Sequence, residues 1–191
     1  LNISSNLSFN EDESGDLEIS ATDIENDNLV YNISGGNDIT ANLNGNNVIF
    51  SATEDFNGTE IFTISVTDGL LTDSDIINVT VNPINDSPVL LTDLSNINFD
   101  EDTSLSMQLF ANDIDGDDLI FGISGGQNIT ATISNSNITF IAPSNYNGEE
   151  AFSINVSDGE LLDSENFFVT VNSINDNPII LSSSPFEVNV S

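Results

Sequence analysis

The sequence predicts an all-β chain of two tandem seven-stranded Greek-key sandwiches of the immunoglobulin-like kind. Three observations support this prediction. The chain matches itself at an offset of 90 residues, apolar and polar residues alternate in short runs, and no stretch has helical spacing of apolar residues. Seven short strands in each copy correspond to the strand number of an immunoglobulin-like sandwich.

The repeat is continuous and needs no gaps. Phe9–Asp12 has its counterpart at Phe99–Asp102, and Ile33–Gly36 has its counterpart at Ile123–Gly126. A copy of this length can bury a core of its own, so each copy is expected to fold as a separate unit. We expect the first repeat over residues 1–88 with a Pro-containing linker at 82–88, the second repeat over 89–178, and the start of a following repeat over 179–191.

Within each copy the alternation has a period of two residues. Phe62, Ile64 and Val66 are separated by polar residues, and a half-buried strand presents such alternate residues to a core. Asn, Asp and Gly lie between these runs, as turns require. The pattern predicts strands near residues 6–9, 16–21, 28–34, 39–43, 47–51, 60–67 and 75–82, and again 90 residues later.

The composition excludes several classes of function. The chain has no Lys, Arg, His, Cys or Trp, and its formal net charge is −32. Nucleic-acid binding needs cationic side chains to neutralise phosphates, and so does docking on an anionic membrane. No apolar run is long enough for insertion into a bilayer. The absence of disulfides favours a secreted prokaryotic protein at the cell surface, with its secretion signal and anchor outside this segment.

The acidic residues gather in clusters, most sharply in the run from Asp113 to Asp117, which has the pattern Asp-x-Asp-Gly-Asp. Hard cations such as Ca²⁺ take several oxygen ligands, whereas zinc prefers the His and Cys that this chain lacks. Clustered like charges cost free energy unless a cation lies among them. The alternative is a solvated acidic turn without a metal. An EF-hand is excluded, because the downstream Glu and the flanking helices are missing.

Five ordered motifs point to a known family. Glu-Asp occurs at the first strand, Asp-x-Asp-Gly-Asp-x-Leu follows the second, and Asn-Gly-x-Glu-x-Phe begins the sixth. Val-x-Asp-Gly ends the sixth strand, and Asn-Asp-x-Pro follows the seventh. This order resembles the cadherin-like tandem repeats of large bacterial surface adhesins and, more distantly, animal cadherin repeats. The resemblance implies Ca²⁺ at each junction between successive repeats.

The same resemblance implies one complete junction and two partial ones. The implied ligands of the central junction are Glu11, Asp12, Glu60, Asn85, Asp86, Asp113, Asp115 and Asp158. The implied ligands of the upstream junction are Asp23, Glu25 and Asp68, and those of the downstream junction are Glu101, Asp102, Glu150, Asn175 and Asp176.

These observations favour a calcium-stiffened structural segment of an extracellular adhesin, fibre or surface-layer protein. Its expected partners are neighbouring repeats of the same chain and copies of itself in a fibre or layer. We predict no enzymatic activity, because metal binding accounts for the carboxylate pairs. Acceptor sequences of the form Asn-x-Ser/Thr, as at Asn32 and Asn137, leave glycosylation open.

The alternative function is a ligand-binding module, for example for glycans. Such a site usually exposes an aromatic platform, and the chain offers only Tyr31 and Tyr146 for this purpose. They align with Phe121 and Phe56 of the other copy, so a core position is expected for both. Exposure of either tyrosine beside a groove would favour the alternative.

Overall fold

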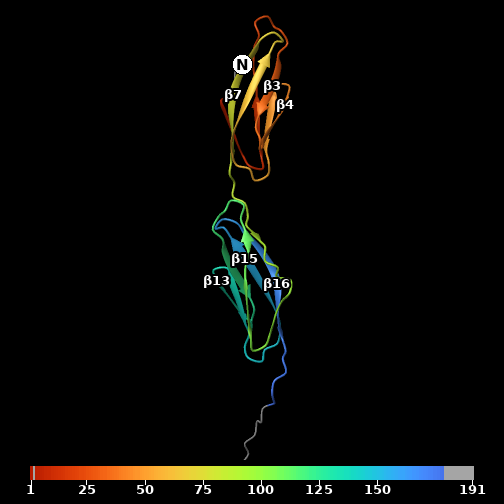
Figure 1. Ribbon diagram of the computed structural model, residues 1–191, viewed down its shortest axis with the longest axis vertical. Helices are drawn as coiled ribbons and strands as arrows, with labels where there is room; N and C mark the ends of the chain where they lie inside the picture. Colours follow the sequence, from red (N-terminus) through yellow and green to blue (C-terminus); the bar gives the residue numbers. More distant parts are fainter. Residues whose placement is uncertain (2, 179–191) are drawn as a thin grey trace, which may run out of the picture. The chain divides into compact units, whose positions relative to one another are not determined.

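The computed structural model describes residues 1 and 3–178, and every regular element in this part of the chain is a β-strand (Figure 1). The chain divides into two compact units, of which the first is Leu1–Asn85 and the second begins at Asp86. The division falls inside the predicted linker at 82–88. The predicted start of a following repeat at 179–191 lies outside the described residues. The described part contains no helix long and apolar enough to cross a membrane.

The first unit is a sandwich of two sheets, as predicted. One sheet has the strand order β1-β7-β6-β3 and the other has the order β2-β5-β4. β1 pairs in parallel with β7, and all other neighbours are antiparallel. The chain crosses between the sheets after β1, β2, β3 and β5, which gives Greek-key connections. The strands are β1 (Asn6–Asn10), β2 (Ser14–Glu18), β3 (Val30–Gly35), β4 (Ile39–Asn44), β5 (Asn47–Ala52), β6 (Gly58–Thr67) and β7 (Thr72–Asn82).

The second unit repeats this plan, with sheets β12-β15-β16-β9 and β10-β14-β13. Its structure also includes a short pair, β8 with β11, that the seven-strand prediction did not include. The pair forms because the incoming chain is held against the sandwich, where the Leu90 N–H donates to Asp163 Oδ2 at 2.9 Å. The strands are β8 (Val89–Leu90), β9 (Ile97–Asp100), β10 (Ser104–Gln108), β11 (Ala111–Asn112), β12 (Ile120–Gly125), β13 (Thr130–Ser134), β14 (Asn137–Ile141), β15 (Gly148–Ser157) and β16 (Leu162–Asn172).

Each unit has a core of its own, built from the predicted inward residues. Phe62 and Ile64 of β6 are fully buried. The rings of Phe50 and Phe62 meet edge to face with their centroids 5.1 Å apart, and Phe140 and Phe152 repeat this contact at 5.5 Å. Such aromatic pairs contribute about 0.5–1.5 kcal/mol beyond the burial of their area. The separate cores agree with the expectation that each copy folds as a unit.

A glycine turn follows β3 and positions part of the candidate site. Gly36 has a φ of +76°, and a Cβ added there would clash with the Ile39 carbonyl oxygen and with the Phe62 ring. Gly126 is in the same situation in the second unit, with a φ of +69°. Only glycine fits both the backbone conformation and the space. The turn directs the next three backbone N–H groups toward a glutamate of β6 or β15.

Candidate metal centre

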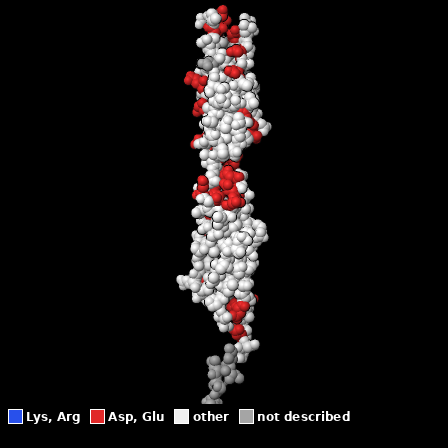
Figure 2. All heavy atoms as spheres, turned by 90° about the vertical axis from the view of Figure 1, so that its left-hand side faces the viewer, with Lys and Arg blue, Asp and Glu red and all other residues white. Residues whose placement is uncertain are grey.

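The carboxylates are unevenly distributed over each unit. Figure 2 shows Asp and Glu gathered in patches that are separated by broad areas without them. The chain has no basic side chain that could pair with these groups. The hydrogen bonds of each cluster therefore decide which carboxylates are free to hold a cation.

Glu11 and Glu101 hold the segments that leave the two units. Both glutamates are buried, with 4% and 6% of their surface exposed. The Glu11 carboxylate accepts the Ile84 N–H, and the Glu101 carboxylate accepts the Ile174 N–H at 2.6 Å. The N–H of each glutamate donates to the carbonyl of the last residue in β7 or β16, at 3.0 and 2.9 Å. Each glutamate thus lies at the point where the linker leaves its unit.

Asp55 is a candidate ligand that the sequence did not indicate. Asp12 and Asp55 each place a carboxylate oxygen within 4.8 Å of the other. Both have a left-handed backbone, with φ values of 60° and 57°, which Asp and Asn tolerate better than most residues. In the second unit Asn145 takes the place of Asp55, and its N–H donates to Asp102 Oδ1 at 3.0 Å. The sequence signal that could have indicated Asp55 is its match with Asn145 at the 90-residue offset, since both residues come just before the sixth strand of their copy (β6 and β15).

Asp113, Asp115 and Asp117 form a carboxylate cluster in the second unit. Each places one oxygen within 4.8 Å of the other two. Asp113 Oδ1 accepts the Asp117 N–H at 3.2 Å, whereas Asp113 Oδ2 is buried and has no hydrogen-bond partner. Gly116, with a φ of 80°, makes the sharp bend within the cluster. A buried ionised oxygen without a partner is costly, and a cation beside it would remove that cost.

The linker reaches this cluster through Asp86. The Asp86 N–H donates to Asp115 Oδ2 at 2.8 Å, and carboxylate oxygens of the two residues lie within 4.8 Å of each other. Asp158 stabilises a turn, because its Oδ1 accepts the N–H groups of Glu160 and Leu161 at 2.6 and 2.7 Å. These bonds cap the turn between β15 and β16. The structure therefore joins Asp86 to the cluster and commits one oxygen of Asp158 to a turn.

The upstream set is partly brought together. Asp23 and Asp68 line one hollow of about 200 Å³ on the first unit, whereas Glu25 is not among its lining residues. Asp68 Oδ1 accepts the N–H groups of Leu71 and Leu70, both at 2.7 Å. These bonds lower the pKa of Asp68. Asp68 thus caps a turn in the same way as Asp158.

Glu60 has partners that the resemblance did not imply. Its two oxygens accept the N–H groups of Asn37, Asp38 and Ile39 at 2.8, 3.1 and 3.0 Å. Burial raises the pKa of Glu60, but these three bonds outweigh burial and lower it. Among the described residues, Glu60 belongs to none of the clusters of three acidic groups. Its observed role is to hold the loop that follows Gly36.

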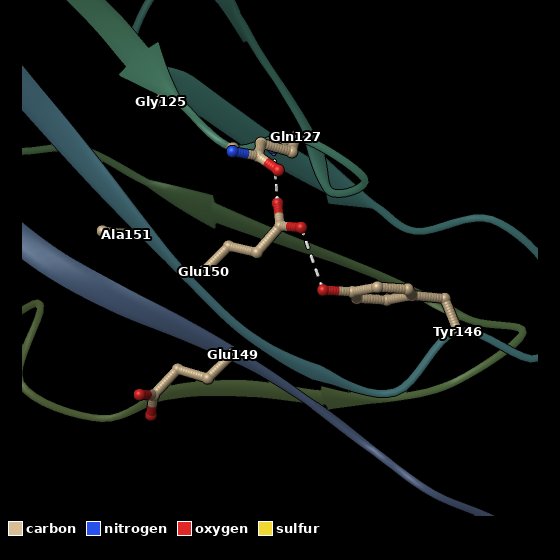
Figure 3. A pocket seen from close by; sticks show the side chains of 7 residues that line it. Gly125, Gln127, Tyr146, Glu149, Glu150 and Ala151 are labelled. Atoms are coloured by element: carbon tan, nitrogen blue, oxygen red, sulfur yellow. Dashed lines mark hydrogen bonds between the residues drawn. The ribbon is translucent and has the colours of Figure 1, made fainter.

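Glu150 has the same role in the second unit and accepts more hydrogen bonds. The N–H groups of Gln127, Asn128 and Ile129 donate to its oxygens at 2.6–3.1 Å. The Asn128 side-chain amide adds a bond of 2.7 Å, and the Tyr146 hydroxyl adds one of 2.9 Å (Figure 3). Burial raises the pKa of Glu150, but the bonds, led by that from the Gln127 N–H, lower it to about 2.

The downstream set ends at the limit of the described chain. Asn175 and Asp176 follow the point where Glu101 holds the exit, and the Asn175 side-chain amide donates to the Asp176 carbonyl oxygen at 3.3 Å. A repeat that could complete this junction would begin in residues that the structure does not describe.

The donor atoms of all these sets are oxygens. Carboxylate and carbonyl oxygens suit Ca²⁺, which takes six to eight of them, better than zinc or softer metals. The residues fit such an ion, since Asp113 Oδ2 is a buried acceptor with no donor and lies among other carboxylates.

Part of the chain is similar in sequence to a cadherin. It is 38% identical over 113 residues to the Fat-like cadherin-related tumor suppressor homolog of Drosophila melanogaster. The match covers 54% of this chain and 2% of the relative, so the chain spans a very small part of that protein.

Solved cadherin structures share the fold. For human protocadherin-24 EC1-2 (form II) the TM-score is 0.58 at 19% identity, covering 91% of this chain and 95% of that chain. For Drosophila N-cadherin EC1-4 the TM-score is 0.55 at 16% identity, covering 90% of this chain and 48% of that chain. At these identities the similarity concerns the fold alone.

A family model matches both copies. The model described as bacterial Ig domain matches residues 2–82 and again 85–172. The two matches follow one another as the two copies of the internal repeat do, and the cadherin similarities agree with the resemblance carried by the five motifs. The chain belongs to the bacterial Ig domain family, as a tandem pair of cadherin-like repeats.

Proposed function

We propose that this chain is a calcium-stiffened spacer within an extracellular adhesin, fibre or surface-layer protein. The observation that carries the proposal is the buried Asp113 oxygen, which has no hydrogen-bond partner and lies beside two further carboxylates. A chain without a single Lys or Arg has no internal cation for this position. A divalent ion from solution would satisfy the oxygen and offset the repulsion between the carboxylates.

The proposed ligands lie along the chain at the exit of the first unit, in the linker and at the entrance of the second unit. The exit of the first unit carries carboxylates next to the held Ile84, and the entrance of the second unit carries the cluster that Asp86 joins. The short linker ties these ends together along the chain. We leave Glu60 outside the ligand set, because three backbone N–H groups already occupy its oxygens. The proposed ligands are Glu11, Asp12, Asp55, Asn85, Asp86, Asp113, Asp115, Asp117 and Asp158.

Stiffening follows from what the protein groups do at this position. Bound Ca²⁺ would supply positive charge that several carboxylates share. Asp86 is part of the linker, so its use as a ligand restricts the backbone of the linker. Glu11 restricts the same segment from the other side by accepting the Ile84 N–H. A linker whose backbone is restricted in this way has less conformational freedom, which is the proposed source of the stiffening.

A location outside the cell suits this role. Bacterial Ig and cadherin-like domains are usually extracellular and typically have no enzymatic activity. Ca²⁺ sites of extracellular modules bind in the range of about 10⁻⁴–10⁻³ M. A spacer of this kind would project a binding domain from a surface or pack beside copies of itself. Its direct partners are then the neighbouring repeats of the same protein.

Two measurements on the whole chain test the proposal. Thermal unfolding is followed between excess chelator and millimolar Ca²⁺, where an ion bound only by the folded chain raises the melting temperature with its concentration. Small-angle X-ray scattering in the same buffers gives the maximum dimension and the spread of inter-unit distances. We expect a narrower spread with Ca²⁺. An unchanged melting temperature together with an unchanged scattering profile would rule the proposal out.

A glycan-binding module is the second candidate. It is favoured by the position of Tyr146, which is half-buried and lines a cavity of about 510 Å³ on the second unit (Figure 3). Tyr31 packs against the core of the first unit, in keeping with its alignment with Phe121. Screening the whole chain against a glycan array, with Tyr146→Ala as the comparison, tests this candidate.

A further inference from the structure

The cavity beside Tyr146 has a composition that its twin position lacks. Its lining includes Tyr146, Glu149 and Ala151 (Figure 3). The equivalent residues of the first unit, 90 positions earlier, are Phe56, Thr59 and Ile61. At three positions around one cavity, the second unit therefore has a hydroxyl group, a carboxylate and a smaller side chain. These differences add polar acceptors and space to a framework that is otherwise repeated.

The acceptors in this cavity are not all equally available. Glu149 is exposed, and within the described part of the chain its one hydrogen bond is a long contact of 3.4 Å from the Thr170 hydroxyl. Glu150 is fully engaged by backbone and side-chain donors, so it contributes negative charge but little free hydrogen-bonding capacity. The Tyr146 hydroxyl donates its hydrogen to Glu150, which leaves the hydroxyl oxygen as an acceptor.

The charge of the cavity restricts the ligand. Two adjacent carboxylates, those of Glu149 and Glu150, contribute to the lining, and no Lys, Arg or His exists anywhere in the chain to balance them. An anionic ligand would be repelled. A ligand that donates hydrogen bonds would match the Glu149 carboxylate and the Tyr146 hydroxyl oxygen as acceptors. A positive charge on the same ligand would match the negative electrostatic potential of the carboxylates. The chain cannot supply such a group itself, so it must come from another molecule.

Tyr146 offers little support for a neutral sugar. Its ring packs against the hydrophobic core of the second unit. A Cβ added at Gly148 would lie 3.2–3.5 Å from the hydroxyl end of the ring, so the backbone of that glycine passes close to Tyr146. An aromatic platform for a sugar needs a free ring face, whereas here the polar edge of the ring is the part that can serve a ligand.

We propose that the cavity lined by Tyr146, Glu149 and Ala151 binds an arginine side chain of a partner protein. The guanidinium group is planar and always charged, and it can donate two parallel hydrogen bonds to the Glu149 carboxylate. The smaller Ala151 provides space that Ile61 would occupy in the first unit. This inference does not depend on the proposed calcium function.

The test uses the whole ¹⁵N-labelled chain in saturating Ca²⁺, which occupies any calcium sites. The probe is arginine blocked at both ends, Nα-acetyl-arginine amide, and the matched neutral probe is the corresponding citrulline derivative. Backbone amide shifts of Gly125, Gly126 and Ala151 are followed during titration. We expect saturable shifts with a dissociation constant in the millimolar range for blocked arginine, weaker binding at higher salt, and no saturation with citrulline.

Variants built from the twin repeat serve as controls. Glu149→Thr and Ala151→Ile introduce the residues that the first unit already carries at these positions, so the fold is expected to tolerate them. Glu149→Thr should weaken blocked-arginine binding at least fivefold, and Ala151→Ile should abolish saturation. Equal binding of arginine and citrulline, saturation by a neutral hexose without arginine binding, or unchanged binding in Glu149→Thr would each overturn the proposal.

Discussion

Replacing Asp113 by Asn is expected to change the stability of the second unit in opposite directions with and without Ca²⁺. In the free protein, the oxygens of Asp113 lie within 4.8 Å of those of Asp115 and Asp117. Two unit charges at that distance repel each other by about 1 kcal/mol in water and about 3.5 kcal/mol at an effective dielectric constant of 20. The substitution removes two such repulsions and the charge on a buried oxygen that has no partner.

We therefore expect Asp113→Asn to raise the free energy of unfolding by about 1–3 kcal/mol in chelator. One kcal/mol corresponds to a shift in melting temperature of roughly 4–8 °C for a unit of this size. In saturating Ca²⁺ the order should reverse, because the variant has lost a charged ligand and gains less from the ion. The size of the reversal depends on the ion concentration, but its sign does not.

The assay needs a signal that reports on the second unit alone. The chain has no Trp, and its two tyrosines lie in different units, Tyr31 in the first and Tyr146 in the second. A Tyr31→Phe background leaves Tyr146 as the fluorescent reporter, and Phe is already the equivalent residue at position 121. Thermal melts in chelator and in Ca²⁺ then compare the parent with Asp113→Asn.

Asp118→Asn is the matched control, because it removes one charge from the same loop and Asp118 belongs to none of the acidic clusters found among the described residues. This control should change the melting temperature slightly and in the same direction in both buffers. If Asp113→Asn shifts it in the same direction with and without Ca²⁺, or if Asp118→Asn reproduces the reversal, the assignment of Asp113 to an ion is refuted.

Further predictions concern the groups around the site. Gly36→Ala should destabilise the first unit by roughly 3–4 kcal/mol in chemical denaturation, because strain at positive φ adds to the clash with core atoms. Gly45 also has a positive φ but has open space around its Cβ, so Gly45→Ala should cost only about 1 kcal/mol. Equal losses in the two variants would contradict the role given to packing at Gly36. The pKa of Glu150 is about 2 against an ordinary value of 4.5, so its stabilising effect is present above about pH 4.5 and is lost as the pH falls toward 2. The full shift corresponds to about 3 kcal/mol, which solvent screening of this partly exposed group reduces to about 1 kcal/mol. Tyr146→Phe removes one donor and should raise the pKa of Glu150, as measured by NMR titration of its carboxyl carbon; an unmoved pKa would exclude that hydrogen bond as a cause. Glu11→Ala leaves the Ile84 N–H without its acceptor and should cost about 1–3 kcal/mol in chelator as well as in Ca²⁺, whereas a loss confined to Ca²⁺ would show that Glu11 acts only as a ligand.

Much of the fold could be predicted because its signals are local. The alternation through Phe62 and Ile64 assigned the inward face of β6, since successive side chains of a strand point to opposite sides. The predicted strand at 106–111 reaches Ala111 of β11, but β8 was missed because it depends on contacts between the incoming chain and distant residues such as Asp163. A two-residue strand carries no periodic pattern, so no inspection of the sequence would have revealed it.

For the candidate site, the sequence alone determined the residue types, the repeat and the spacing of Asp113, Asp115 and Asp117, and these are sufficient to indicate a hard cation. Only the tertiary structure decided which carboxylates have oxygens to spare. Glu60 and Asp113 look equally suitable in the sequence, yet three backbone N–H groups donate to Glu60 while one oxygen of Asp113 is buried without a donor. Asp55 also became a proposed ligand only in the folded chain, because folding brings its carboxylate within 4.8 Å of that of Asp12. The physical cause is that a carboxylate is satisfied by donors from remote segments, and only the folded chain brings those donors to it.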